Sequence, residues 1–215
     1  MTKLVWDTIG ERYYENGVSN GVLFVDDSGY AWSGLVSVET SPSGGEPRPY
    51  YIDGQKYRNL ATAEEFEATI TAIGAPLEFA ECDGLSSIQN GLYAGQQRRK
   101  AFDLSYQTRV SSDANEDLGY KIHIVYNCLA SPSERDYRTL GEAAEPTQLS
   151  WRITTVPAGS LIPASFGIRP TAYFVVDSRF TSAGIMTDLS EILYGSELSS
   201  SYIPAVGDLL DMFNV

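Results

Sequence analysis

Two stretches near the middle of the chain decide the fold: AFDLSYQTRV at residues 101–110 and YKIHIVYNCLA at residues 120–130. In each stretch apolar and polar side chains alternate with a period of two, which is typical of a β-strand with one apolar and one solvated face. Residues 111–119 between them are rich in Asp, Asn, Ser and Gly, which favour turns. The pattern predicts one long antiparallel hairpin, whose apolar face needs a second layer from the rest of the chain.

Further short strands and two helices are predicted on either side of this hairpin. Strands are expected at residues 21–26, 30–39, 66–73, 148–156 and 169–177, where β-branched and aromatic residues are frequent. Residues 75–97 lack a regular pattern, and Thr62 and Glu65 have the spacing of a helical capping box. Helices are expected at residues 187–194 and 204–213. The chain shows no internal repeat, so residues 1–215 are predicted to form a single, mainly β domain. We expect a sandwich or barrel-like body, with the short helices and the C-terminal tail over residues 187–215.

Two segments are predicted to leave the body of this domain. Residues 1–20 are expected to form an N-terminal arm, because their aromatic side chains stand in a polar stretch without clean periodicity. Residues 40–58 are expected to form a long excursion loop, since three prolines and two glycines between residues 40 and 49 exclude regular ladder pairing. Asp53-Gly54 is a hairpin signal, so the excursion should end in a small ribbon. The aromatic residues of both segments need a partner surface.

The charge balance of the chain argues against several classes of partner. With 15 Lys and Arg against 28 Asp and Glu, the formal net charge is −13. A binder of duplex DNA needs a cationic face, and binding to an anionic membrane needs one too. Cys82 and Cys128 are expected to be free, buried thiols, with one disulfide as the alternative. The first residues lack a signal-peptide core and no apolar run reaches the length of a membrane span, so synthesis in a reducing cytosol is expected.

The sequence offers few candidates for catalysis. Its single histidine, His123, lies within a predicted strand, where a structural role is expected. Cys128 lies five residues away and so faces the opposite side of a regular strand, and no Gly-x-Ser-x-Gly motif is present. Acidic pairs such as Glu64/Glu65 suit a glycosidase, but 28 acidic residues produce such pairs by chance. We predict a protein that is not an enzyme and that has no cofactor and no metal site.

Several motifs, taken in order along the chain, resemble those of a known family. They are GERYYENG (10–17), YYID (50–53) followed by Lys56-Tyr57, AEEF (63–66), PLEFAECDG (76–84), GQQRR (95–99), LSYQT (104–108), GYKIH (119–123), ASPSE (130–134) and LYG (193–195). Each motif alone is unspecific. The ordered set covers most of the chain and resembles the major tail tube proteins of siphophages, the bacteriophages with long, flexible, non-contractile tails.

The resemblance implies a structural virion protein. Subunits of that family form hexameric rings, and the rings stack into the tail tube that delivers the genome into the host. The resemblance therefore implies location in the virion tail, after assembly in the host cytoplasm. It implies the tape measure protein, the tail terminator and the distal tail proteins as further partners.

The resemblance also implies a β-sandwich subunit whose strands join a continuous inner barrel. Double-stranded DNA would pass along this barrel without sticking, because an acidic wall repels phosphate weakly. The polar residues of the first central stretch are candidates for the lumen: Asp103, Ser105, Gln107 and Arg109.

Contacts between rings or subunits are expected from the two projecting segments. The candidates are Tyr13 and Tyr14 of the arm, and Arg48, Tyr50, Tyr51, Lys56, Tyr57 and Arg58 of the excursion. Aromatic residues and arginine dominate the energetics of many interfaces. Two other functions remain open: a lectin-like or Ig-like binding module displayed on a particle, and a carboxylate-based hydrolase.

Overall fold

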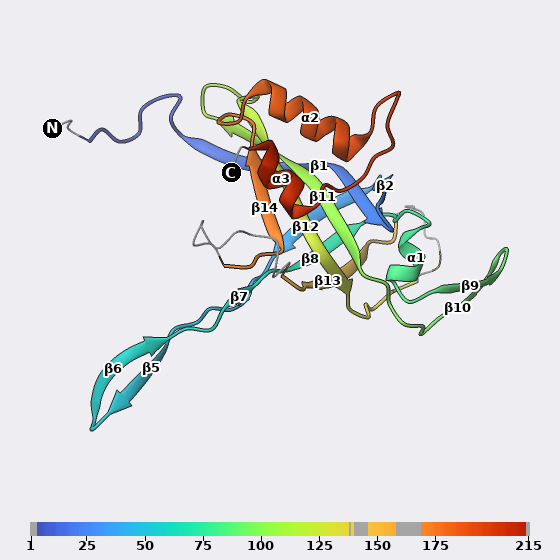
Figure 1. The fold of residues 1–215 in the computed structure, drawn as a ribbon, viewed down its shortest axis with the longest axis horizontal. Helices are drawn as coiled ribbons and strands as arrows, with labels where there is room; N and C mark the ends of the chain where they lie inside the picture. The colour runs from blue at the N-terminus through green and yellow to red at the C-terminus, as the bar shows by residue number, and fades with distance from the viewer. Residues whose placement is uncertain (1–3, 138, 140–145, 158–168, 214–215) are drawn as a thin grey trace.

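The chain folds around one large antiparallel sheet, which the computed structural model describes for residues 4–137, 139, 146–157 and 169–213 (Figure 1). In order of pairing, its strands are β2 (Ser28–Ala31), β1 (Tyr13–Val25), β11 (Phe102–Ser112), β12 (Gly119–Ala130), β13 (Leu149–Thr155), β8 (Glu67–Ala72) and β3 (Leu35–Thr40). A further strand, β14 (Tyr173–Asp177), pairs with β12 beside this row. The predicted central hairpin is confirmed as β11 and β12, which pair along most of their length.

The connection between β2 and β3 shows that the sheet curls on itself. These two strands lie at opposite ends of the row, yet only residues 32–34 join them. The ends of the sheet must therefore meet. They meet beside β1, where the backbone N–H of Trp32 donates to the carbonyl of Gly21 at 2.8 Å. The predicted mainly β, barrel-like body is confirmed.

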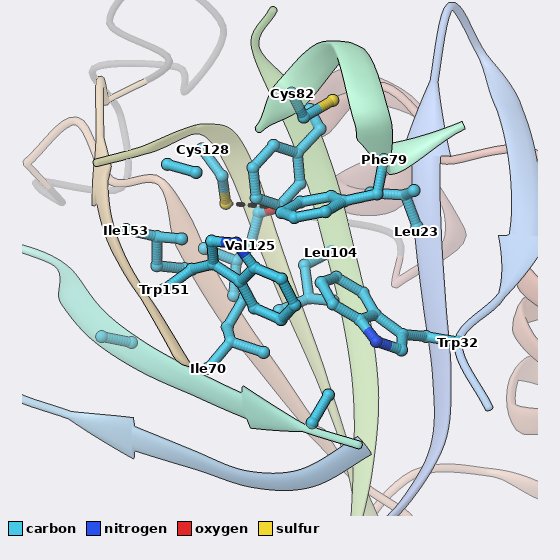
Figure 2. Packing of buried hydrophobic residues seen from close by; sticks show 14 of the residues in the cluster. Leu23, Trp32, Ile70, Phe79, Cys82, Leu104, Val125, Cys128, Trp151 and Ile153 are labelled. Carbon is cyan, nitrogen blue, oxygen red and sulfur yellow. Dashed lines mark hydrogen bonds between the residues drawn. The ribbon is translucent and has the colours of Figure 1, made fainter. Parts of the chain in front are cut away.

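Aromatic side chains fill the interior of the curled sheet (Figure 2). The ring of Phe79, in the short helix α1 (Phe79–Cys82), lies 4.9 Å from Trp32 and 5.0 Å from Trp151 between ring centroids. These three side chains are almost fully buried. Cys82 and Cys128 lie in the same core as free thiols, as expected, and burial raises the pKa of Cys82 to about 11. Helix α1 thus closes the interior by packing Phe79 against Trp32 and Trp151.

A second core lies on the outer face of the sheet. Two helices, α2 (Ala183–Tyr194) and α3 (Val206–Met212), cover β1, β11, β12 and β14 there (Figure 1). Ile122, Ile124 and Tyr126 of β12 point to these helices, whereas Leu104 and Val125 point to the interior. The expectation of one solvated face on the central hairpin is therefore wrong. The apolar sets of the two strands lie on opposite faces, because the register places Leu104 opposite Val125.

Asn127 allows β12 to serve two partner strands. Residues up to Val125 pair with β14, and residues from Cys128 pair with β13. Asn127 lies between them with a φ of +51°, and its N–H donates to Asp103 Oδ1 at 2.6 Å. The extra residue of such a bulge reverses the alternation of side chains, so Val125 and Cys128 both face the interior.

Several predicted boundaries are corrected by pairing that the local sequence does not reveal. Strand β1 begins at Tyr13 rather than at residue 21, so the N-terminal arm is shorter than residues 1–20. The single strand expected over residues 30–39 is two strands, β2 and β3. The helical turn expected at Thr62 is absent: Glu64–Glu65 form β7, which pairs with β4 (Ser43–Gly44).

The other predicted elements agree more closely with the structure. Strands β8 and β13 confirm the predictions at residues 66–73 and 148–156, and α3 confirms the helix within residues 204–213. Strand β14 begins four residues later than expected. Helix α2 begins four residues earlier, after Ser182, whose side chain accepts from the N–H of Ile185. Residues 75–97, expected to be irregular, contain α1 and a hairpin of β9 (Ser86–Gln89) and β10 (Leu92–Ala94).

Candidate assembly surfaces

A two-stranded ribbon projects far from the body where the excursion was predicted (Figure 1). Strands β5 (Arg48–Ile52) and β6 (Gln55–Leu60) pair antiparallel, and Asp53 and Gly54 turn between them with φ of +50° and +75°. Two positive φ values are the signature of a type I′ turn, which Asp-Gly favours, so the predicted ribbon is confirmed. The expectation that prolines exclude regular strand pairing in this segment is wrong at Pro49, which pairs with Asn59 in β6. Both strands of a lone ribbon are edges, where a proline without an N–H is tolerated.

All side chains of this ribbon are exposed, including three tyrosines. Tyr57 keeps 70% of its surface in solvent. Opposed residues of an antiparallel pair share a face, so Tyr50 lies beside Arg58 on one face and Tyr51 beside Lys56 on the other. Within the described part of the chain, no ion pair involves the cations of the ribbon: Arg48, Lys56 and Arg58. The ribbon therefore presents aromatic surface together with uncompensated positive charge.

A narrow neck joins the ribbon to the body. Strands β4 and β7 form it through two pairs, one of which places Gly44 opposite Glu64. Gly44 has a φ of +77°, and a Cβ there would lie 2.5 Å from the carbonyl oxygen of Ala63, so the position requires glycine. At the base of the neck, hydrogen bonds from Ser43 and Arg152 lower the pKa of Glu67. The excursion thus spans residues 41–66, beyond the predicted limit of residue 58.

The N-terminal arm, residues 4–12, runs away from the body and carries apolar side chains in solvent (Figure 1). Four of them are large, and Trp6 keeps 75% of its surface exposed: Leu4, Val5, Trp6 and Ile9. Among the residues that the structure describes, only the base of the arm is bonded to the body, where the N–H of Gly10 donates to Asp113 Oδ1 at 2.8 Å. The sequence indicated an arm from its aromatic residues, but it did not distinguish this apolar tip from the strand that follows.

Tyr13 and Tyr14, the two arm candidates, lie at the start of β1 rather than in the arm. Both stay exposed although they pair with Ser112 and Ser111 of β11. The guanidinium carbon of Arg179 lies 5.6 Å from the centre of the Tyr13 ring, which fixes that ring against the body. The structure therefore groups them with the sheet surface and not with the ribbon tyrosines.

A third apolar projection was missed by sequence reasoning. The hairpin of β9 and β10 leaves the body on the side away from the ribbon, with Ile88, Leu92 and Tyr93 exposed (Figure 1). The Asn90-Gly91 pair at its turn is a hairpin signal of the same kind as Asp53-Gly54. Residues on either side of this turn do not alternate, so the signal alone did not indicate strands.

The four lumen candidates on β11 do not form one solvated face. Ser105 is fully buried, and it lies opposite Ile124 on the face that the helices cover, so it cannot line a channel. Asp103 is half-buried, and burial raises its pKa. Gln107 is also half-buried and accepts from Asn20 Nδ2 at 2.6 Å, whereas Arg109 is exposed. The prediction that Ser105 lines the lumen is therefore wrong, because the sequence did not show which face of the sheet the helices cover.

His123 lies at the centre of a polar network between β1, β11, β12 and β14. Its Nδ1 lies 2.6 Å from the hydroxyl of Tyr173, and its Nε2 lies 2.8 Å from the hydroxyl of Thr108. The ring stacks on Tyr106 with 4.5 Å between centroids and 3° between planes. Thr108 donates to Glu15 Oε1 at 2.6 Å, so it must accept from Nε2, which assigns the tautomer. Tyr173 is then the donor to Nδ1.

This network does not have the geometry of a nucleophilic relay. In such a relay the histidine nitrogen accepts the proton of the hydroxyl, whereas here Nε2 donates to Thr108. The carboxylate of Glu15 lies on the same side of the ring, with Oε1 3.4 Å from Nε2, instead of orienting Nδ1. Glu15 also forms an ion pair with Lys121. The arrangement holds four strands together, which is the structural role that the sequence indicated for His123.

Helix α2 borders an open pocket on an acidic part of the surface. The pocket has a volume of about 540 Å³ and is lined by Tyr120, Ala183, Met186, Glu191 and Tyr194, among others. Residues 182–213 contain five Asp and Glu and no Lys or Arg. All five are exposed, and none forms a salt bridge within the described residues: Asp188, Glu191, Glu197, Asp208 and Asp211. The helical layer, residues 182–213, thus carries negative charges and no positive ones.

Comparison with known proteins does not identify the chain. No protein-family model matches its sequence, and the comparison with curated proteins found no match. Within the ranges that the structure describes, no group of three or more His, Cys, Asp and Glu residues is arranged to hold a metal ion. No helix of those ranges has both the length and the apolar character needed to cross a membrane. The surfaces that stand out are the ribbon, the arm and the acidic helical layer.

Proposed function

We propose that this protein is a structural subunit of a siphophage tail tube. Copies of the chain assemble into hexameric rings, and the rings stack into a tube that conducts double-stranded DNA into the host. Its partners are further copies of itself, with the tape measure protein, the tail terminator and the distal tail proteins at the tube's lumen and ends. Its location is the virion tail, after assembly in the host cytoplasm.

One observation carries this proposal: three projections expose large apolar side chains that the protomer itself does not cover. They are the ribbon, the N-terminal arm and the β9–β10 hairpin, with Tyr57, Trp6 and Ile88 each at least 66% exposed. Apolar surface of this kind marks interaction sites on soluble proteins. Because the projections leave the body in different directions, one protomer has the means to contact several neighbours (Figure 1).

The edges of the sheet and the charge of the chain also favour assembly around DNA. Among the strands that the structure describes, β14 pairs with β12 alone, which leaves an edge that a neighbouring strand can extend. A net charge of −13 disfavours adhesion of a polyanion to the wall of a conduit. The ordered motifs that resemble tail tube proteins point to the same function.

Assembly of the purified protein tests the proposal. The protein is concentrated in steps, its mass is followed by size-exclusion chromatography with light scattering, and each step is imaged by negative-stain electron microscopy. Rings of six subunits and stacked tubes are expected. A protein that stays monomeric at millimolar concentration, alone and with purified tail partners, contradicts the proposal. Binding to glycans without assembly would favour the lectin-like alternative.

A further inference from the structure

We propose that the ribbon of one copy docks into the pocket along α2 of a second copy. The inference rests on the proposed function and adds to it the acceptor surface for the contact between rings. The occupant is the tip of the β5–β6 ribbon, and the acceptor is the outer side of α2 with its acidic residues. The contact is an interaction between copies of this chain and needs no other partner.

Charge is the first argument for this pairing. The ribbon has three cations against one carboxylate, Asp53, in a chain in which acids outnumber bases. The helical layer has five carboxylates and no cation over residues 182–213. Neither set is neutralised inside the described protomer, so both keep their full charge for a partner. Complementary patches of this kind set the rate and the register of docking.

The shape and chemistry of the pocket are the second argument. Met186 and Tyr194 supply apolar and aromatic lining, and Glu191 stands at the same pocket. Tyr57 is the most exposed tyrosine of the ribbon, and its neighbour in sequence Lys56 carries a cation. A tyrosine in a pocket with a charged pair at the rim is a common form of interface hot spot. Methionine adapts its shape to an incoming aromatic ring.

The placement of the two surfaces is the third argument. In Figure 1 the ribbon leaves the body at the lower left, whereas α2 lies across the top. A contact between two different surfaces of the same chain is heterologous, and it repeats along a filament when the rotation between successive copies does not close a ring. Such a contact builds a stack, whereas a contact between identical surfaces would end at a dimer.

Reversing the charges of the ribbon and of α2 separately, and then together in one variant, tests the contact. One variant has Lys56→Glu and Arg58→Glu, a second has Asp188→Lys and Glu191→Lys, and a third combines all four changes. Each of the first two variants is expected to raise the concentration needed for polymers about tenfold or more, because like charges then face one another. The combined variant should recover most of the loss. Thermal unfolding of each monomer checks that the fold is kept.

Matched controls use exposed charges that lie away from both surfaces. Arg98→Glu and Glu78→Lys change the net charge in the same directions, and neither residue forms a salt bridge within the described residues. Both controls should polymerise at nearly the wild-type concentration. A loss as large as in the test variants would show that net charge, and not this contact, controls assembly.

A disulfide between copies gives a second, independent measurement. Tyr57→Cys is combined with Thr187→Cys, an exposed residue that lines the pocket, and the assembled protein is oxidised. A ladder of covalent oligomers is expected, and Tyr57→Cys with Glu78→Cys, at an exposed residue before α1, should give none. This inference is overturned if the wild-type protein polymerises, the cysteine pair gives no ladder and the Asp188→Lys/Glu191→Lys variant assembles normally. The proposed function would then still stand. A wild-type protein that forms no polymer overturns both.

Discussion

At the scale of single residues, His123 illustrates how a lone histidine is used for structure. Both of its ring nitrogens are occupied, by Thr108 and by Tyr173, and its ring is stacked on Tyr106. Burial lowers the pKa of His123, so the neutral form is favoured in the folded protein. For Glu15, burial alone would raise the pKa, but hydrogen bonds from Lys121 and Thr108 outweigh it and the pKa is lowered.

These shifts predict that acid destabilises the protein in two steps. The ordinary pKa of histidine is 6.5, and below it the unfolded chain takes up a proton that folded His123 takes up only at lower pH. The unfolded state then binds more protons, so the free energy of unfolding falls as the pH drops. Glu15 adds a second loss below its ordinary value of 4.5, for the same reason. Urea denaturation between pH 8 and pH 3 measures both steps.

The His123→Gln variant separates the first step from the second. We expect its free energy of unfolding at pH 7 to be about 1–3 kcal/mol lower than that of the wild type, because the buried partners of His123 lose hydrogen bonds. It should also lose the decline that begins below pH 6.5 and keep the decline below pH 4.5. Assembly should be nearly unchanged once the variant is folded. A hydrolytic activity that disappears in this variant would contradict the structural role of His123.

At the scale of elements, the ribbon is predicted to be dispensable for folding and necessary for stacking. Replacement of residues 48–60 by a short Gly-Ser linker removes β5 and β6 and keeps the neck, which pairs Ser43 with Glu65. All ribbon residues are exposed, so the loss of buried surface is small and the thermal midpoint should change by only a few degrees. Electron microscopy should show rings but no long tubes. Long tubes of normal appearance would place the stacking contact elsewhere.

The elements that could be predicted from sequence are those in which one local signal is sufficient. The alternation in β11 and β12 and the Asp53-Gly54 turn are of this kind. Strand β1 starts eight residues earlier than predicted, because Tyr13 and the residues after it become a strand only through pairing with β11. Thr62 and Glu65 suggested a capping box, yet the pairing of Glu64 and Glu65 with β4 overrides that preference.

The candidate contact residues divide in the same way. The tyrosines and cations of the ribbon were found from composition and turn chemistry, and all of them are exposed. The lumen candidates failed at Ser105, because whether a polar face meets solvent depends on where distant helices pack. The acceptor pocket at α2 includes Tyr120 and Met186, which are far apart in the chain, so no local pattern could reveal it.

At the scale of the whole molecule, the charge predicts that duplex DNA will not bind. A short duplex mixed with the protein at low salt should show no mobility shift up to about 10⁻⁴ M, which is the weak end of non-specific binding. The ribbon cations form the exception to the acidic surface, so a variant with Arg48→Gln, Lys56→Gln and Arg58→Gln is the control. Binding that weakens with added salt and disappears in this variant would contradict a non-adhesive conduit.

The neck of the ribbon also has a mechanical consequence. It is a joint of two residue pairs between a rigid barrel and a lever made of β5 and β6, and Gly44 at that joint has no side chain to stiffen it. A load applied at the tip of the lever therefore deforms the joint before it strains the barrel. In a stack linked by such levers, curvature would be taken up between rings while each ring kept its bore, and the filament would bend without kinking its channel.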